Sequence, residues 1–246
     1  MKNIISIIIL FFLTSPISAQ EIQGVITYNR KTNYISIMSK LPHISQEEVD
    51  RMSLTWGNWN SKGRDYDLSF KKNKSLYELK EQETGDGYSW KPDKFILTRD
   101  YKTNQKFDII ETLGKVYLIE EDIPKIKWKI LNEIKEVAGY LCMKAETKNE
   151  VKGQTIHAWF ADGINFMGGP EGYGGLPGMI LELDINNGDA IITATEVNLN
   201  GVEVDTSLPK KVKGKNISQS DLDEIVKKYI DDTIEGKKNP YWRVRY

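Results

Sequence analysis

Residues 168–183 read GGPEGYGGLPGMILEL, and this stretch decides how the rest of the chain is arranged. Its first eleven residues hold six of the nineteen glycines and two of the eight prolines of the chain. Glycine reaches backbone angles that other residues adopt only at a cost, and proline fixes φ and removes a donor, so together they specify one loop shape. The apolar run over residues 179–183 predicts a buried strand that leaves this loop.

The N-terminus has the three-part pattern of a secretory signal peptide: Lys2, an almost wholly apolar run over residues 4–13, and small residues up to Ala19. The run is too short for a membrane-spanning helix of about 20 residues, and no later run is long enough. No cysteine follows it, which disfavours a lipid anchor. We therefore expect residues 1–19 to be a cleaved signal peptide. Residues 20–246 are then a single β-rich domain, exported to the periplasm and without a membrane span.

The overall charge indicates no particular partner. The chain has 34 basic and 35 acidic residues, so the patch of positive charge typical of nucleic-acid binding is not expected. Cys142 is the single cysteine and cannot form an intramolecular disulfide. Because it sits in a strand-like segment, a part-buried and inert thiol is favoured over a reactive one.

Alternating apolar residues predict a series of antiparallel strands. Asn187 and Asn200 each precede a glycine, and such pairs favour tight hairpin turns, so residues 179–205 are expected to form three consecutive strands. The tail at residues 241–246 alternates like a final strand. The other expected strands are residues 22–28, 66–70, 75–79, 95–98, 106–110, 116–119, 126–130, 140–147 and 155–160.

Two helices are expected. Ser45 and Glu48 form a capping box that begins a short helix to about Met52. Ser218 or Ser220 begins a longer helix that Gly236 ends, and its apolar residues form one stripe. The stripe is Leu222, Ile225, Val226, Tyr229, Ile230 and Ile234. The expected fold class is α+β: a curved, mostly antiparallel β-sheet with the C-terminal helix packed on it, a half-barrel that resembles the lipoprotein carrier LolA.

The glycine-rich loop does not fit a nucleotide cofactor. A phosphate-binding loop needs Lys-Ser or Lys-Thr after its last glycine, whereas Met179 and Ile180 follow here. The dinucleotide fingerprint needs a helix after the loop, and a strand is expected instead. Two interpretations remain: a rigid crossover that directs the following strand, or a binding rim from which Glu171 and Tyr173 project.

Metal and catalytic patterns are sparse. His43 and His157 are the only histidines, and no zinc-binding spacing or serine nucleophile motif is present. His157 and Trp159 are two residues apart and should share one face of a strand, with Asp162 just beyond its end. We assign no catalytic residue, no metal ligand and no cofactor. The residues expected to bind a ligand are Tyr173, Glu171, Trp159, His157 and Asp162.

Residues 175–180 resemble the hexapeptide that names the GLPGLI family of Bacteroidetes exported proteins, with Met179 in place of the usual leucine. Residues 162–165 depart from that family, which commonly has a proline after the isoleucine. Further similar elements are Trp128-Lys129, Gly139, Cys142 to Ala145, Ala158 to Phe160, and Leu208 to Lys211. The residues of the structural motif are Gly169, Pro170, Gly175, Leu176, Pro177, Gly178, Met179 and Ile180.

The GLPGLI resemblance implies export into a cell envelope and association with outer-membrane transport, and it implies no catalytic residues. The first hypothesis is therefore a binding or accessory protein of an outer-membrane transport or envelope-assembly system, with an apolar or peptidic ligand in the cup of the sheet. The alternatives are a hydrolase using carboxylates near the loop, and a purely structural envelope protein. The interior of the sheet distinguishes the three hypotheses. A lined apolar cavity favours a binding protein, convergent carboxylates in a cleft favour a hydrolase, and a filled core favours a structural protein.

Overall fold

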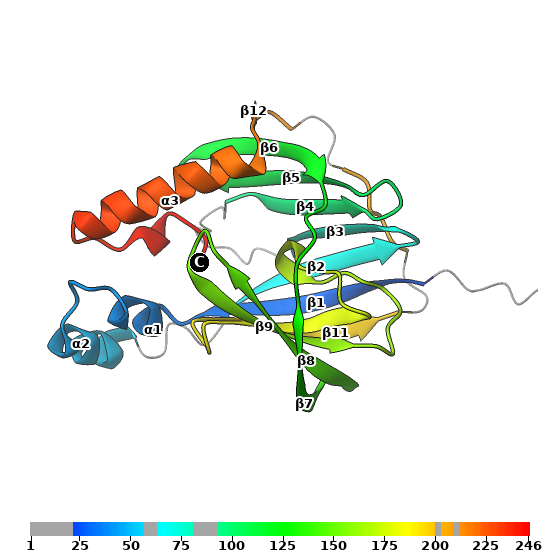
Figure 1. Cartoon of the computed structure of the whole chain (residues 1–246), viewed down its shortest axis with the longest axis horizontal. Helices are drawn as coiled ribbons and strands as arrows, with labels where there is room; N and C mark the ends of the chain where they lie inside the picture. Colours follow the sequence, from blue (N-terminus) through cyan, green and yellow to red (C-terminus); the bar gives the residue numbers. More distant parts are fainter. Residues whose placement is uncertain (1–21, 57–62, 81–92, 200–202, 209–211) are drawn as a thin grey trace, which may run out of the picture.

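A single, strongly curved β-sheet is the main element of the described chain (Figure 1). The computed structural model describes residues 22–56, 63–80, 93–199, 203–208 and 212–246. The sheet has twelve strands in the order β12-β6-β5-β4-β3-β2-β1-β11-β10-β9-β8-β7. In the described part of the chain its pairings are antiparallel, apart from the short parallel pairing of β12 with β6. The strands are β1 (Gln23–Thr32), β2 (Arg64–Lys71), β3 (Lys74–Leu79), β4 (Phe95–Asp100), β5 (Gln105–Thr112), β6 (Lys115–Asp122), β7 (Lys129–Val137), β8 (Tyr140–Asn149), β9 (Gln154–Ala161), β10 (Met179–Ile185), β11 (Ala190–Asn198) and β12 (Lys215–Asn216).

Most of the expected strands are confirmed, and three expectations are wrong. Residues 126–128 lie in an irregular crossing from β6 to β7, so the strand expected at 126–130 starts only at Lys129. Residues 203–205 are not in a strand, and Asn200 lies outside the described residues. The tail at 241–246 is irregular after a short 3-10 turn, η2 (Pro240–Trp242).

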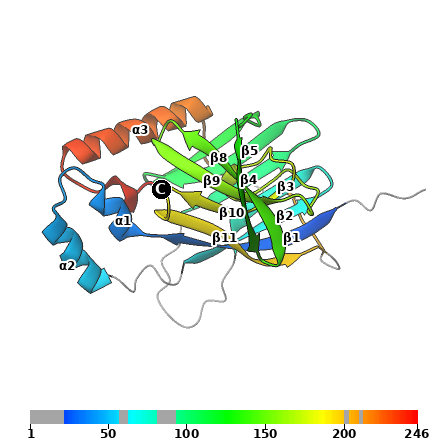
Figure 2. The ribbon, with the colours of Figure 1, turned by 60° about the horizontal axis from the view of Figure 1, so that its bottom comes forward.

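Both predicted helices are present, and the structure adds one more. In α2 (Gln46–Trp56), Glu48 bonds the amide and hydroxyl of Ser45, as the capping box requires. In α3 (Gln219–Glu235), the Ser218 hydroxyl accepts from the amide of Asp221. The unexpected helix α1 (Tyr34–Ser39) follows β1 and is capped by Asn33. Figures 1 and 2 show α1 and α2 together beyond the end of β1, away from α3.

Helix α3 packs on the β5–β6 end of the sheet, as its apolar stripe predicts. Leu222, Val226 and Ile230 are buried against Tyr117 and Ile119 of β6. The α+β class, with a curved antiparallel sheet and a docked C-terminal helix, is therefore confirmed.

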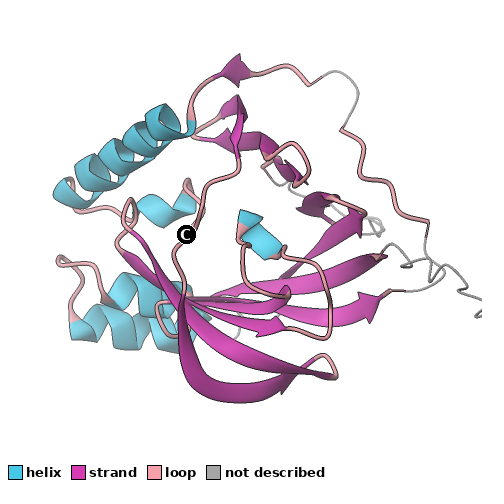
Figure 3. Cartoon of the chain, turned by 45° about the vertical axis from the view of Figure 1, so that its right-hand side comes forward, coloured by secondary structure: helices cyan, strands magenta, loops and turns pink. Residues whose placement is uncertain are grey.

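The concave side of the sheet is filled by the chain itself. The loop between β9 and β10 lies inside the curve of the sheet (Figure 3), where its Ile164, Phe166 and Leu176 are buried with the sheet residues. The Phe166 ring lies 4.7 Å from that of Phe70 on β2. The region that could have been an apolar cavity therefore holds a packed core around residues 162–178. By the criterion given above, this outcome favours the structural alternative over a ligand held in the cup, and a binding site would have to lie outside the cup.

The signal peptide expected at residues 1–19 lies outside the described residues. Within the described ranges, no helix is both long and apolar enough to cross a membrane.

Candidate functional site

The glycine-rich loop is held against the start of β10 by close backbone contacts. Gly178 has φ +150°, and a Cβ there would lie 2.2 Å from the carbonyl oxygen of Ala161. A Cβ on Gly169 would lie 2.7 Å from that of Ile180. These approaches require glycine, and they fix where the loop's remaining side chains point.

Glu171 is the charged residue that this loop carries into the interior. It lies in the short 3-10 turn η1 (Pro170–Gly172) with φ 56°, and its side chain is 9% exposed. Its Oε1 accepts hydrogen bonds from Arg245 Nη2 at 2.5 Å and from Tyr77 at 3.1 Å, and its Oε2 accepts from Arg245 Nε at 2.8 Å. Arg30 Nε lies 3.5 Å from Oε1. The carboxylate thus faces two guanidinium groups and a phenol.

Aromatic rings complete the surroundings of Arg245. Its guanidinium carbon lies 4.0 Å from the ring centroid of Phe95 and 4.7 Å from that of Tyr66. Its Nη1 donates to the Tyr66 hydroxyl at 2.8 Å. We call Glu171, Tyr66, Tyr77 and Phe95 the arginine pocket. A planar cation between rings, with a bidentate carboxylate, is an arrangement that suits arginine and not lysine.

The electrostatics of the pocket follow from this pairing. Burial alone would raise the pKa of Glu171, but Arg245 and Arg30 outweigh burial and lower it from 4.5 to about 2. Burial opposes the charge of Arg245 too, yet Glu171 raises the pKa of that guanidinium above its ordinary value. Burial and the neighbouring Arg30 lower the pKa of Lys152, in the turn after β8, from 10.5 to about 8. A carboxylate held this firmly in its ionised form is a poor general acid.

Tyr173 does not project from an exposed rim. Its ring lies 6.2 Å from that of Trp128, whose Nε1 donates to the carbonyl of Gly174. Burial raises the pKa of Tyr173 to about 12. The side chain packs against the core and helps to hold the loop in place.

His157 and Trp159 lie on the opposite, outer face of the sheet. In the strand register, Trp159 lies between Lys144 and Glu182, and His157 between Glu146 and Asp184. Lys135 and Lys144 place their ammonium groups 4.4 and 5.4 Å from the Trp159 ring centroid and cover it.

His157 Nε2 lies 3.2 Å from Glu146 Oε2, and Lys135 pairs with Glu182. On this outer face the charges of Lys135 and Glu182 neutralise each other. Asp162 is exposed in the turn after β9. The five residues expected to form one binding site are thus divided between two faces and a turn.

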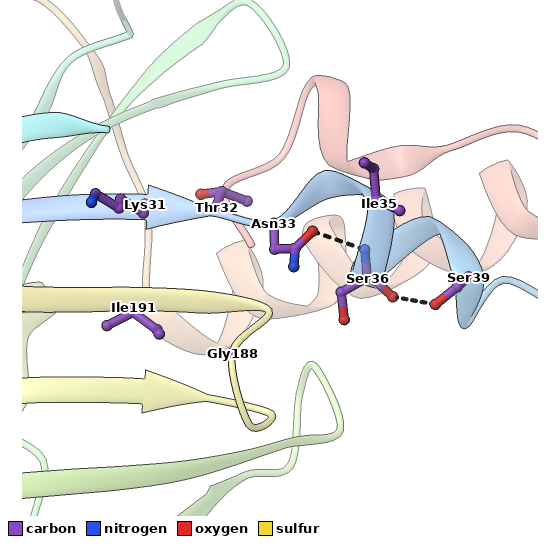
Figure 4. A pocket seen from close by; sticks show the side chains of 8 residues that line it. All are labelled: Lys31, Thr32, Asn33, Ile35, Ser36, Ser39, Gly188 and Ile191. Atoms are coloured by element: carbon purple, nitrogen blue, oxygen red, sulfur yellow. Dashed lines mark hydrogen bonds between the residues drawn. The ribbon is translucent and has the colours of Figure 1, made fainter. Parts of the chain in front are cut away.

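A surface pocket that the sequence did not predict lies between α1 and the β10–β11 turn (Figure 4). Its volume is about 490 Å³. Of the eight described residues that line it, Lys31 is the only one with an ionisable side chain. The lining residues are Lys31, Thr32, Asn33, Ile35, Ser36, Ser39, Gly188 and Ile191. We call this the α1 pocket.

A buried carboxylate anchors Ser36, one of the residues that line the α1 pocket. Asp189 is fully buried and accepts hydrogen bonds from Ser36 at 2.6 Å, from Lys40 at 2.6 Å and from the Tyr246 hydroxyl at 2.5 Å. This network ties α1, including the lining residue Ser36, to the turn between β10 and β11. The Asn187-Gly188 turn was predicted, and its residues have the expected positive φ. The signal missed was Asn33, an N-cap before a short apolar run.

No group of three or more His, Cys, Asp or Glu side chains is placed to hold a metal ion within the described ranges. Cys142 is buried, and burial raises the pKa of its thiol to about 11. That thiol is a poor nucleophile at neutral pH.

The fold and its loop define a class of protein: an open antiparallel sheet curved around its own β9–β10 loop. Residues 69–226 match the family described as N-glycanase peptide, N-terminal domain, and the chain belongs to that family. The GLPGLI resemblance has no counterpart in this match. No curated protein matches the chain.

Solved structures of PNGF-II have a similar fold. The structure in space group P21 aligns with a TM-score of 0.54 at 15% identity, over 83% of this chain and 33% of that one. The structure in space group C2 aligns with a TM-score of 0.51 at 14% identity, over 83% and 32%. The chain therefore spans about a third of the PNGF-II chains, and at these identities the likeness concerns the fold.

Proposed function

We propose that this chain is a non-catalytic recognition domain that binds an N-glycopeptide at the α1 pocket. The observation that carries the proposal is the lining of that pocket. Hydroxyl groups and one ammonium group suit the hydroxyls and amides of such a ligand, whereas Lys31 alone offers no acid–base pair for a reaction.

Two further observations support binding outside the cup. The interior is occupied by the buried loop residues Ile164, Phe166 and Leu176. Glu171, the carboxylate that the loop carries into the interior, is paired with Arg245. The sequence suggested an apolar or a peptidic ligand inside the cup. We therefore propose a peptidic ligand, bound on the outer surface of the molecule.

The family supplies the glycan part of the proposal. The matching family is named for an N-glycanase and for its N-terminal domain, and this chain spans about a third of PNGF-II. We propose on this basis that the chain is an accessory that holds the substrate for chemistry performed elsewhere.

The setting is proposed from the sequence. The signal-peptide pattern at residues 1–19 and the GLPGLI resemblance support an exported, periplasmic protein that serves an outer-membrane transport or envelope-assembly system. The curved sheet with a docked helix also supports a LolA-like architecture within that envelope.

The test compares the parent with Lys31→Glu, with Lys115→Glu as the matched control. Lys31 lines the pocket, whereas Lys115 is an exposed lysine at the β5–β6 turn. Titration calorimetry with an N-glycopeptide should show binding to the parent and to Lys115→Glu. Binding to Lys31→Glu should be weaker by about tenfold, which corresponds to about 1.4 kcal/mol. Equal affinity of the three proteins for the glycopeptide would show that the ligand does not bind at the α1 pocket.

A further inference from the structure

Residues 243–246 are held in the cup without joining the sheet. They follow η2 and have no strand pairing in the described structure, although their alternating sequence predicted a strand. Figure 3 shows the chain end lying within the opening of the sheet. What holds this segment is a set of side chains from separate elements.

Two cationic side chains bind the backbone of the segment. Lys152 Nζ donates to the carbonyl oxygen of Arg245 at 2.6 Å, and Arg30 Nη2 donates at 2.7 Å to the main-chain oxygen of Tyr246, the last residue of the sequence. These bonds reach main-chain atoms, so they hold any extended peptide in that position.

Two side-chain sites then select the residues of the segment. Arg245 enters the arginine pocket, where it stacks on Phe95 and Tyr66 and meets the Glu171 carboxylate twice. The Tyr246 hydroxyl donates to Asp189 Oδ2 at 2.5 Å and accepts from Asn186 Nδ2 at 2.6 Å. Its ring meets Tyr241 edge-on at 4.7 Å.

This division of work is the one by which proteins hold peptide ligands: contacts to the main chain give affinity, and pockets for side chains give specificity. Bidentate pairing between aromatic faces also distinguishes a guanidinium from an ammonium ion. Residues 243–246 belong to the chain itself, but they are held by the two kinds of contact that hold a bound peptide: hydrogen bonds to the main chain and pockets for the side chains.

We propose that the arginine pocket is a recognition site for an extended peptide carrying arginine followed by an aromatic residue, and that residues 243–246 occupy it as an internal ligand. The arginine pocket shares no lining residue with the α1 pocket, although Asp189 bonds both Tyr246 of this segment and Ser36 of the α1 pocket. The first test, Arg245→Ala, leaves Tyr246 and Asp189 in place. A peptide of the same chemistry competes with the segment for the cup.

The first test empties the pocket in the full chain with Arg245→Ala. N-ethylguanidinium should raise the thermal midpoint of this variant by about 3–6 °C when its free concentration is about tenfold above the dissociation constant. Ethylammonium should give a clearly smaller shift, and neither ion should stabilise the parent. Equal shifts for the two ions, or no shift for ethylguanidinium, overturn the proposal.

A second variant shows which group recognises the ion. Adding Glu171→Gln to Arg245→Ala removes the carboxylate and should abolish the response to ethylguanidinium; a response that persists contradicts the assigned site. If Arg245→Ala does not fold, it is refolded from urea with each ion present. Recovery with ethylguanidinium and not with ethylammonium supports the pocket, and recovery with neither overturns it.

The peptide part is tested with both side-chain sites vacated, in Arg245→Ala/Tyr246→Ala. Acetyl-Val-Arg-Tyr-amide should bind this protein, and acetyl-Val-Lys-Tyr-amide should bind at least about tenfold more weakly. Equal binding of the two peptides, or binding of neither, contradicts an arginine-specific peptide site.

Discussion

Glu171 is a buried carboxylate on which polar contacts from three parts of the chain converge. Its carboxylate is the partner of Arg245 and Arg30, and Lys152 lies near the same group. Removing one partner of a buried ion pair leaves the other charges without compensation, which is costly. We therefore expect Glu171→Gln to destabilise the protein by about 3–5 kcal/mol at pH 7, as measured by urea unfolding.

The pH dependence of this contribution has a definite sign. The pKa of Glu171 is about 2 in the folded chain against an ordinary 4.5, so the folded state favours the ionised form. Its contribution, about 3 kcal/mol, is fully present above pH 4.5 and is lost as the pH falls towards 2. The difference between parent and Glu171→Gln should shrink over that window. Glu133→Gln, which breaks a pair with a half-exposed carboxylate, is the control and should change little. A constant difference from pH 7 to pH 2 would contradict the assigned pairing.

Lys152 should also make stability rise with pH, but at alkaline pH and because its charged form is disfavoured in the folded chain. Its folded pKa is about 8 against an ordinary 10.5, so between these values the unfolded chain binds more protons. Stability from this group therefore rises as the pH increases from about 8 towards 10.5. Relative to the parent, Lys152→Met should lack that rise, whereas the exposed Lys148→Met on the same hairpin should keep it. Parallel stability profiles of the parent and Lys152→Met would refute this assignment.

Gly178 tests the backbone of the loop. With φ +150° and a would-be Cβ 2.2 Å from a carbonyl oxygen, Gly178→Ala combines backbone strain with overlap. We expect a loss of about 2–5 kcal/mol in unfolding free energy. Gly163→Ala is the matched control, because it has open space and no positive φ. If both variants unfold at the same urea concentration, the loop does not need glycine at 178.

At the scale of the elements, helix α3 closes the β5–β6 end of the sheet. Ile230 is buried with Val226 and Tyr117, so Ile230→Ala should cost about 2–5 kcal/mol. Lys228→Ala on the exposed face should unfold near the parent's midpoint, since the Lys228 side chain is exposed and pairs with the exposed Asp232 of the same helix. Equal urea midpoints for the three proteins would show that α3 is not docked.

The elements that could be predicted are those whose local pattern agrees with their final environment. The α3 stripe and the Asn187-Gly188 turn are of this kind, because period and turn chemistry determined both. The strand predicted at residues 241–246 was wrong because its local pattern does not agree with its final environment. Arg245 alternates with Val244 and Tyr246 as in a strand, but its partners Glu171 and Tyr66 are distant in sequence. No local pattern records such contacts.

At the scale of the whole molecule, contacts between residues distant in sequence also explain why the candidate sites could be predicted only in part. The shared face of His157 and Trp159 followed from strand periodicity, and the register confirms it. That Glu171 lies on the opposite face depends on the loop folding into the cup, which the sequence does not specify. The α1 pocket joins residues 31–39 to the β10–β11 turn, and only the pairing of β1 with β11 brings them together.

The central claim, that the chain binds a glycopeptide outside the cup without converting it, is tested most directly by one titration. An N-glycopeptide is added to ¹⁵N-labelled protein, amide shifts are followed by NMR, and the ligand is then weighed by mass spectrometry. We predict shifts concentrated at residues 31–39 and Gly188, with a ligand of unchanged mass and a weaker response to the peptide without its glycan. A cleaved ligand, or shifts confined to residues 168–178, would contradict the account.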